Sequence, residues 1–441
     1  MKKVMMLAVL SMMVCLVACG SSEVTNQREN EVEENDIATE EADDSFEEDD
    51  DIVEEEADDV AEQSEEGEKP AEESADSMEL TVDADYADLT ESEGFVFESN
   101  GDGTCTLTDI GVCSDADIVI PEKSPEGDLV TMIGEYAFHD AEDISTIVFA
   151  GRTMELDEKA FQSCEVEKIV ITGCDMVISE NAFAYCEDVS ELYISNSNLE
   201  VASYAFYDMG KDMEVKIVNC TGVLDKKAFQ SCGVANLVMN DSVLEIEENA
   251  FSYCEDLAAV TFANCTMDIG SYAFYDCGDD AIVTFTNCDA QLDEKAFQSC
   301  GLVELVISGS EMVMGESTFA YCEDLTDVVI GANNIEIDSY SFYDCTSLVN
   351  VSIATESEDD NINLVIEEKA FQSCAVQNVI IGRGAIELGD NAFAYCEDLI
   401  SVEIKGTLSD LGDYVFYDCP DELVIMYHDV TYNKESIEAA D

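Results

Sequence analysis

The chain has 441 residues, of which 102 are Asp or Glu and 17 are Lys or Arg, so its formal net charge is −85. After Glu93 alone, 69 acidic residues stand against 13 basic ones, a net charge of −56. A surface of this charge repels phosphates, so the composition excludes nucleic acid as a partner. Basic patches on other proteins are compatible with it.

Residues 1–18 have the pattern of a signal peptide. Lys2 and Lys3 precede an apolar stretch from Val4 to Val17, which is too short to cross a bilayer. The chain then reads Leu16-Val17-Ala18-Cys19, which resembles the bacterial lipobox, whose cysteine carries diacylglycerol and becomes the first residue of the mature chain. We therefore expect a lipid anchor to the membrane at Cys19 and a location on the extracellular face of the cell envelope. In the alternative interpretation the segment is an ordinary secretory signal and Cys19 is incidental.

An acidic segment follows the expected anchor. Between Glu23 and Glu79 there are 28 acidic residues, two basic residues and one aromatic residue. Such a segment buries too little apolar surface to offset the entropy of ordering it, and its charges repel one another. We expect residues 19–93 to form an extended, disordered tether. The alternative is a cation sponge or a decoy for basic proteins.

Beyond the tether, the pair Ala-Phe or a close variant recurs thirteen times. The phenylalanines are separated by 22 or 23 residues, except for one interval of 29 that contains an acidic insertion at Thr355 to Asn363; they are Phe138, Phe161, Phe183, Phe206, Phe229, Phe251, Phe274, Phe297, Phe319, Phe342, Phe371, Phe393 and Phe416. A fixed short period of this kind predicts a repeat solenoid. We assign residues 94–132 to an N-terminal cap, 133–427 to the solenoid and 428–441 to a C-terminal tail.

A longer period lies on top of the first. Lys-Ala-Phe-Gln-Ser-Cys, Ala-Phe-(Ala/Ser)-Tyr-Cys-Glu-Asp and Tyr-x-Phe-Tyr-Asp alternate in this order, so that the array consists of four copies of a three-repeat block. Any surface feature is therefore presented several times along one axis. Such an arrangement suits multivalent binding better than a single catalytic pocket.

Each unit contains one clear strand pattern. The run Leu325 to Ile330 alternates apolar residues before a turn, as a strand with one face in a core requires. An apolar residue such as Ile178 follows, and the Ala-Phe-x-x-Cys element is short enough to form one or two turns that bring the Phe inward. Because one coil cannot bury its own apolar face, stacking on the next coil must complete the core. The predicted fold is an array of short parallel strands joined by short helical or turn segments.

The pattern Ile-x-x-x-Ala-Phe-x-x-Cys-x-x-Leu-x-x-Val-x-Ile resembles the BspA-like (Treponema-type) leucine-rich repeat family of bacterial surface proteins, over about Thr131 to Tyr427. The resemblance implies adhesion to host matrix proteins and to other cells, with host or bacterial surface proteins or glycans as partners. It transfers no site, because the repeat motif is a folding motif. Met209 and Ala141 depart from the pattern by replacing the expected cysteine.

Eleven cysteines occupy the same position, three residues after the Phe. One position repeated along a solenoid forms a ladder, so we expect free, buried thiols there. A second set lies just after the strands, and we expect it to be partly exposed and the better source of any disulfide; it comprises Cys174, Cys220, Cys265 and Cys288.

Motifs for catalysis, metal or cofactor binding are missing from the sequence. Its two histidines, His139 and His428, lie far apart, and the cysteine spacing is not that of a zinc site. We expect no enzyme, no cofactor and no metal site. The recurring Glu-Asp pairs, such as Glu187 and Asp188, are interpreted as a solvated face, with a calcium ladder as the alternative.

The candidate binding face is a row of strand residues that alternate with the inward ones and should face solvent. Its apolar members recur along the array and are Val170, Tyr193, Val238, Val306, Val329 and Ile380. Such a row on an acidic surface is typical of an interaction site, although strand propensity alone also explains it. The sequence thus predicts an adhesin-like surface lipoprotein. The alternatives are an envelope spacer without a specific partner and an accessory protein that captures peptides or glycans.

Overall fold

The computed structural model describes residues 90–331, 334–353 and 363–437. The expected signal peptide, Cys19, the tether up to residue 89 and nearly all of the insertion lie outside the described residues. None of the helices in these ranges has the length and apolarity needed to cross a membrane. The described part is a β-solenoid of about 14 turns, which confirms the predicted fold class.

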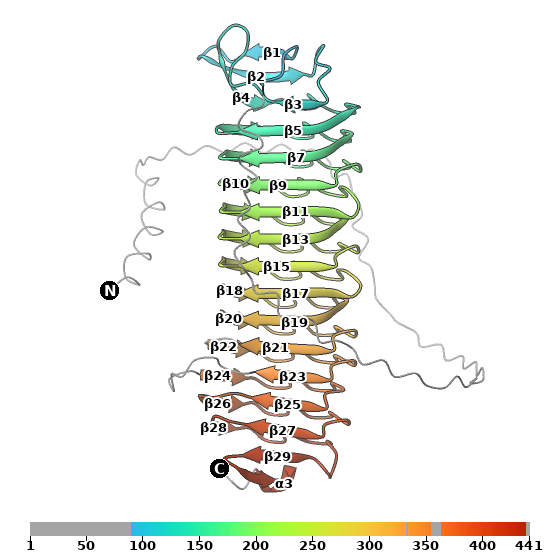
Figure 1. Cartoon of the computed structure of the whole chain (residues 1–441), viewed down its shortest axis with the longest axis vertical. Coiled ribbons are helices and arrows are strands. Elements are labelled where there is room, and N and C mark those ends of the chain that lie inside the picture. Colours follow the sequence, from blue (N-terminus) through green and yellow to red (C-terminus); the bar gives the residue numbers. More distant parts are fainter. Residues whose placement is uncertain (1–89, 332–333, 354–362, 438–441) are drawn as a thin grey trace, which may run out of the picture. The chain divides into compact units, whose positions relative to one another are not determined.

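The strands form two sheets of 15 strands each, and both sheets are visible in Figure 1. Sheet A consists, in spatial order, of β1 (Val96–Ser99), β2 (Thr104–Asp109), β4 (Leu129–Ile133), β6 (Thr153–Leu156), β8 (Asp175–Ile178), β10 (Asn198–Val201), β12 (Thr221–Leu224), β14 (Val243–Ile246), β16 (Thr266–Ile269), β18 (Asp289–Leu292), β20 (Glu311–Met314), β22 (Asn334–Ile337), β24 (Asn363–Ile366), β26 (Ala385–Leu388) and β28 (Thr407–Leu411).

Sheet B is built from the strands that the sequence predicts. It consists of β3 (Asp117–Val119), β5 (Ile144–Ala150), β7 (Val166–Thr172), β9 (Glu191–Ser195), β11 (Met213–Val218), β13 (Val234–Asn240), β15 (Ala259–Ala263), β17 (Ala281–Thr286), β19 (Leu302–Ser308), β21 (Asp327–Gly331), β23 (Asn350–Ile353), β25 (Asn378–Ile381), β27 (Ser401–Ile404), β29 (Val424–Tyr427) and β30 (Val430–Tyr432).

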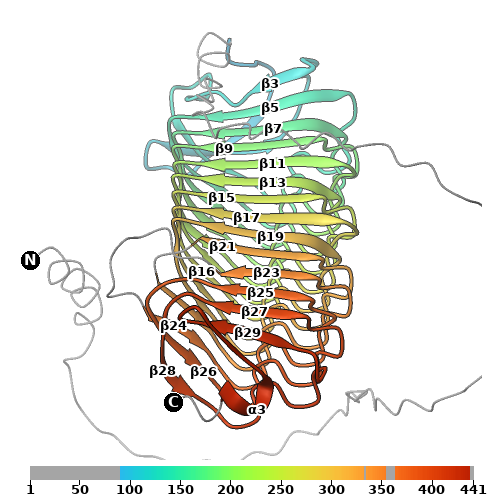
Figure 2. The same cartoon turned by 60° about the horizontal axis from the view of Figure 1, so that its bottom comes forward.

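Each coil therefore contributes two strands, where the sequence analysis expects one. The strands of sheet A are mostly four residues long and alternate exposed and buried positions, as in Thr266-Met267-Asp268-Ile269. Ile178, expected as an isolated apolar residue after a turn, ends one of these strands. Figure 2 shows the two sheets as separate walls joined by turns.

The core lies between the two sheets and the Phe turns. All thirteen phenylalanines of the repeats are buried, and the centroids of successive rings are 4.5 to 6.0 Å apart. The turns are not helical. In each one, the residues two before and two after the Phe have a left-handed backbone, for example Tyr272 (φ 59°) and Asp276 (φ 53°). Hydrogen bonds to the next coil hold this conformation, such as the one from the Phe274 N–H to the Ala296 carbonyl (2.7 Å).

An antiparallel strand ends sheet A at the N-terminal end of the stack and sheet B at the C-terminal end, whereas β28 and β3 end the other sides as parallel strands. At the N-terminal end, β1 pairs with β2 in antiparallel orientation, and β2 begins the parallel array. At the C-terminal end, β30 folds back antiparallel to β29. The short helix α3 (Lys434–Ile437) follows, and its Ile437 side chain is buried in the core. Residues 430–437, part of the segment assigned to a tail, thus form the end of the solenoid.

Candidate functional site

The predicted row is one line across the outer face of sheet B. Strand pairing aligns each member with the next in register, and the thirteen aligned positions are Val148, Val170, Tyr193, Lys216, Val238, Thr261, Thr284, Val306, Val329, Ser352, Ile380, Glu403 and Met426. Their neighbours in each strand belong to the core, whereas none of the thirteen does. The row therefore points away from the core.

The exposure of the row changes along the stack. Val329 and Met426 each have 42% of their surface exposed, and Val238, Val306 and Ile380 are half-buried. The expectation of solvent exposure is wrong for Val148, Val170 and Tyr193, which are buried. These three side chains pack in line with Val119 in a small apolar cluster outside the core, bordered by Ala150 and Val218. Solvent reaches the row only from Lys216 onward.

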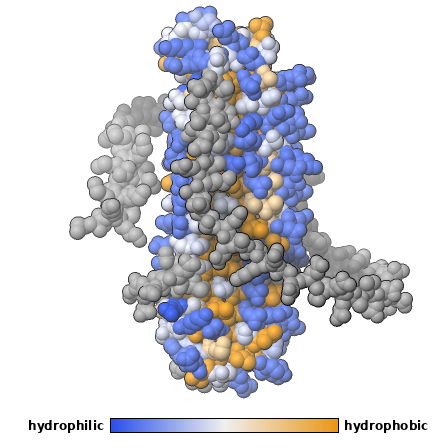
Figure 3. Space-filling model, in the orientation of Figure 1, coloured by the Kyte–Doolittle hydropathy of each residue, from blue (hydrophilic) through white to orange (hydrophobic). Residues whose placement is uncertain are grey.

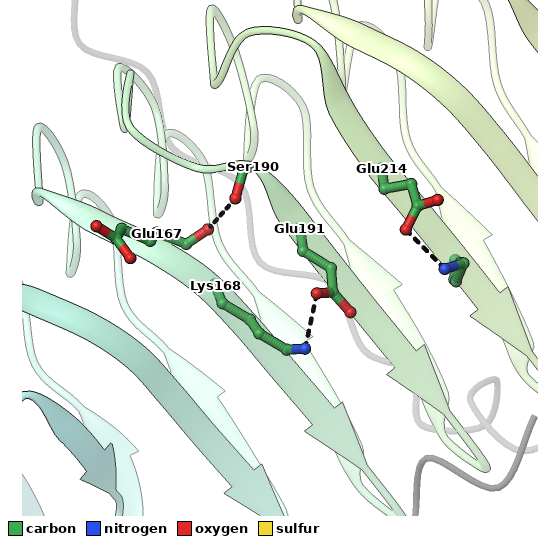
Figure 4. A network of polar contacts seen from close by, with 6 residues as sticks. Glu167, Lys168, Ser190, Glu191 and Glu214 are labelled. Atoms are coloured by element: carbon green, nitrogen blue, oxygen red, sulfur yellow. Dashed lines mark hydrogen bonds and ion pairs between the residues drawn. The ribbon is translucent and has the colours of Figure 1, made fainter.

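Charged side chains flank the N-terminal part of the row. Lys168 on β7 donates to a carboxylate oxygen of Glu191 on β9 at 2.7 Å, and Lys216 donates to Glu214 at the same distance (Figure 4). Further along, β13, β15 and β17 contain no charged residue at all. Figure 3 views this face and shows hydrophobic side chains along its middle in the C-terminal half, between hydrophilic ones on both sides. The middle of sheet B, over β13, β15 and β17, thus presents an uncharged surface on a strongly acidic domain.

The outer face of sheet A is acidic instead. Two shallow hollows lie on it, and carboxylates alternate there with valines, as in Glu200, Val223 and Glu245. Burial, and then the neighbouring Glu247 carboxylate, raise the pKa of Glu245. Burial likewise raises the pKa of Asp293, with Asp268 contributing. Burial, aided by neighbouring carboxylates, therefore disfavours the ionised form of Glu245 and of Asp293.

Within the described ranges, no three His, Cys, Asp or Glu side chains converge as metal ligands. The Glu-Asp pairs that recur with the block, Glu187 and Asp188 among them, are exposed. His139 and His428 lie at opposite ends of the array. The described part of the chain thus presents exposed surfaces without a converging set of metal ligands.

The cysteine ladder lies in the core and is free of disulfides, as expected. Nine of its eleven thiols donate to the carbonyl of the Phe in the preceding coil; for Cys277 and Phe251 the distance is 3.0 Å. Cys300 donates to the Cys277 carbonyl instead. Burial raises the pKa of Cys186 and of Cys232 to about 12. These thiols are therefore unreactive, and their role is to pack the core.

The second set of cysteines is also buried, contrary to the expected partial exposure. These cysteines sit where the chain passes from sheet B to sheet A, and their side chains turn into the core. The backbone N–H groups of Cys174, Cys220 and Cys288 each donate to a serine hydroxyl of the next coil, as from Cys220 to Ser242 (3.1 Å). The corner is therefore closed by hydrogen bonds rather than open to solvent.

The sequence analysis missed a group of tyrosines on the outside of the Phe turns. The motifs Ala-Tyr-Cys-Glu-Asp and Tyr-x-Phe-Tyr-Asp belong to neighbouring coils, and the stack brings their tyrosines into contact, as for Tyr253 and Tyr275. The three-coil period could have revealed these tyrosines. The coils share one fold, so a residue that differs between coils but recurs in every block is not required by the fold.

Two stacked parallel sheets, a column of inward Phe side chains and strict register between coils define a leucine-rich-repeat-like β-solenoid. The chain belongs to the family of the BspA type leucine rich repeat region, which matches more than half of it, in six copies over residues 113–233, 222–349 and 364–437. None of the curated proteins compared with the chain matches it.

Solved structures that are similar to the chain include three bacterial proteins. A leucine-rich repeat protein from Bacteroides ovatus is 19% identical, with a TM-score of 0.45, over 77% of this chain and 88% of that one. A leucine rich cell surface protein from Faecalibacterium prausnitzii is 16% identical, with a TM-score of 0.28, over 72% and 89%. The pneumococcal vaccine antigen PcpA is 13% identical, with a TM-score of 0.28, over 79% and 97%.

Proposed function

We propose that the chain is a cell-surface lipoprotein, anchored through Cys19, that displays its solenoid to bind proteins or glycans of other cells or of a host matrix. Binding is favoured over catalysis because the described residues present extended surfaces, and no three of their His, Cys, Asp or Glu side chains converge as metal ligands. The observation that carries the proposal is the uncharged outer face of β13, β15 and β17, which contrasts with the net charge of −56 after Glu93. Uncharged strand surface loses less hydration on binding than carboxylates do.

The proposed face is tested by placing charge on it. The double variant Val238→Lys and Val306→Lys should fold, because both side chains lie outside the core. Its affinity for purified matrix proteins or for whole cells should fall by about 1 kcal/mol or more, as at an interface centre. The matched control, Val223→Lys with Val313→Lys, adds the same charge to the outer face of sheet A and should leave binding unchanged. Equal binding by wild type and by the sheet B variant would overturn this assignment.

The anchor is tested separately. Cys19→Ala should release the protein into the medium or leave it unprocessed, because no residue then accepts diacylglycerol. Mass spectrometry of the membrane fraction and detergent partitioning measure this. A membrane-bound variant with unchanged mass and unchanged partitioning would show that Cys19 carries no lipid. A lipid-anchored chain that binds neither cells nor matrix would favour the role of an envelope spacer.

A further inference from the structure

The tyrosines outside the Phe turns form four equivalent clusters. In each cluster, a Tyr two residues after one Phe meets the Tyr one residue after the next Phe, and this second ring meets a Tyr two residues before the same Phe. The four Tyr clusters are Tyr185/Tyr207/Tyr204, Tyr253/Tyr275/Tyr272, Tyr321/Tyr343/Tyr340 and Tyr395/Tyr417/Tyr414. Ring centroids are 5.5 to 5.9 Å apart and the rings meet edge to face.

The first ring of each cluster is open to solvent. Its exposed fraction is 40% to 43% in all four copies: Tyr185, Tyr253, Tyr321 and Tyr395. The fold does not require tyrosine here, because serine stands at the same place in other coils. Tyr253 has a φ of 61°, and Ser231 in the preceding coil has a φ of 59°. A bulky side chain at a left-handed position carries backbone strain that serine or asparagine would reduce.

Three of the four clusters already hold a cation at their third ring. The Lys227 ammonium lies 5.4 Å from the centroid of Tyr204, and the equivalent distances are 5.2 Å for Lys295 and Tyr272 and 4.9 Å for Lys369 and Tyr340. Each ammonium also donates to the hydroxyl of the same tyrosine, at 3.0, 2.9 and 2.6 Å respectively, so it lies at the hydroxyl end of the ring. A tyrosine of these clusters thus already binds a cation within the protein itself.

Carboxylates surround each cluster. An Asp follows the second Tyr directly, as Asp276 follows Tyr275, and a Glu-Asp pair begins two residues after the first Tyr, as Glu255 and Asp256 do after Tyr253. All three of these carboxylates are exposed. Each cluster therefore combines open ring faces with more negative than positive charge, and both features favour a positively charged partner.

The spacing of the clusters specifies the form of that partner. Equivalent residues in successive clusters are three coils apart, which is roughly 14 Å at about 4.8 Å per coil. An extended polypeptide covers this distance with about four residues. We propose that the Tyr clusters bind an extended basic polypeptide whose Arg or Lys side chains, about four residues apart, lie on the exposed tyrosine rings. This surface is distinct from the row across sheet B, so the two proposals fail independently.

The test removes the rings without changing the charge. The quadruple variant Tyr185→Ser, Tyr253→Ser, Tyr321→Ser and Tyr395→Ser gives these positions the residue that Ser163, Ser231, Ser299 and Ser373 already supply at the same φ. The probe is a fluorescein-labelled peptide of four Arg-Gly-Ser-Gly units, and its binding to the full chain is measured by anisotropy. Each Tyr→Ser change should weaken binding about two- to fivefold, and the quadruple change at least tenfold.

Controls separate ring contacts from general attraction to an acidic protein. Val177→Ser with Val313→Ser, two similarly exposed positions on the outer face of sheet A, should bind the peptide as wild type does. A peptide with Gln in place of Arg should not bind, and one with Arg at every sixth residue should bind more weakly. Circular dichroism confirms that the variants fold. Unchanged affinity of the folded quadruple variant, or equal binding of the Gln peptide, would overturn the proposal.

Discussion

The inner and outer sides of the Phe turns follow different periods. On the inner side, a Phe recurs in every coil, and each ring stacks on the rings above and below it. The residue directly after the Phe is His in the first coil and then Gln, Ala or Ser, and Tyr in turn, so that Tyr returns every third coil. The Ala and Ser members are buried and most Tyr members are half-buried, so this position differs in environment as well as in identity. Stacking of the Phe rings requires identity at each step of the array, whereas a position outside that column can vary from coil to coil. The shorter period therefore belongs to the Phe column and the longer one to the residues beside it.

The largest effect is expected on the inner side, at Phe274. Phe274→Ala removes a fully buried ring that stacks on Phe251 and Phe297 at 5.1 and 4.6 Å. The local loss of stability should be about 3–5 kcal/mol. Because coils contact only their neighbours, the loss should split thermal unfolding into two transitions. Differential scanning calorimetry measures this, and a single transition identical to that of wild type would contradict the packing described here.

Alkaline pH should act on the inner side as well. Burial raises the pKa of Cys220 and of Cys419 to about 11, whereas an unfolded thiol titrates near about 8.5. The folded chain keeps these protons when the unfolded chain has lost them, so stability is complete below about pH 8.5 and falls as the pH rises toward 11. The Tm should follow this course. Cys220→Ala with Cys419→Ala should make the decline shallower, and a Tm that is constant up to pH 11 would count against buried thiols.

A smaller effect is expected where the chain turns from sheet B to sheet A. Asn264 has a left-handed backbone (φ 55°), and Gly309 occupies the equivalent position in a later coil (φ 62°). Asn264→Ala should lower the free energy of unfolding by about 1 kcal/mol, because alanine disfavours this conformation. Asn264→Gly is the matched control and should change it by less than about 0.5 kcal/mol. Equal stability of the two variants in urea titration would show that the turn from sheet B to sheet A does not require a left-handed backbone at residue 264.

The smallest effect is expected one residue away from Phe274. Tyr275→Gln inserts the residue that Gln162 and Gln230 supply at the same position in other coils. This variant should lower the free energy of unfolding by less than about 1 kcal/mol, which is the contribution expected from the edge-to-face contacts with Tyr253 and Tyr272. Urea titration of Tyr275→Gln and of Phe274→Ala measures the loss of unfolding free energy in each variant. Equal losses in the two variants would mean that the residues on both sides of the turn stabilise the fold to the same extent.

The sequence predicts the features that are encoded within a single coil. The Phe column, the cysteine ladder and the alternation of sheet B follow from the short period, and strand pairing then aligns the row from Val148 to Met426 as expected. Sheet A was missed because four residues such as Asn198 to Val201, half of them polar, are too short to stand out as a strand. Their partners come from other coils, and no pattern within one unit shows them.

The candidate surfaces were harder to predict for the same reason. Alternation places Val170 and Tyr193 outside the core, yet it does not reveal that they pack together and lose their exposure. The contact between Tyr253 and Tyr275 depends on two left-handed residues per turn, which the sequence alone did not suggest. Contacts that join side chains of different coils follow from the geometry of the stack, whereas burial within one coil follows from its own residues.

The antiparallel strands leave the two sheets with unlike ends. A parallel strand with unpaired backbone groups at its edge is a template for another strand, as in amyloid fibrils. Here β1 runs against the direction of sheet A at its N-terminal end, and β30 runs against that of sheet B at its C-terminal end, where Ile437 of α3 is buried in the core. Among the described strands, β28 of sheet A and β3 of sheet B end their sheets as parallel strands. A second molecule that approached either end would therefore meet a parallel edge in one sheet and an antiparallel one in the other, which opposes the addition of a complete further coil.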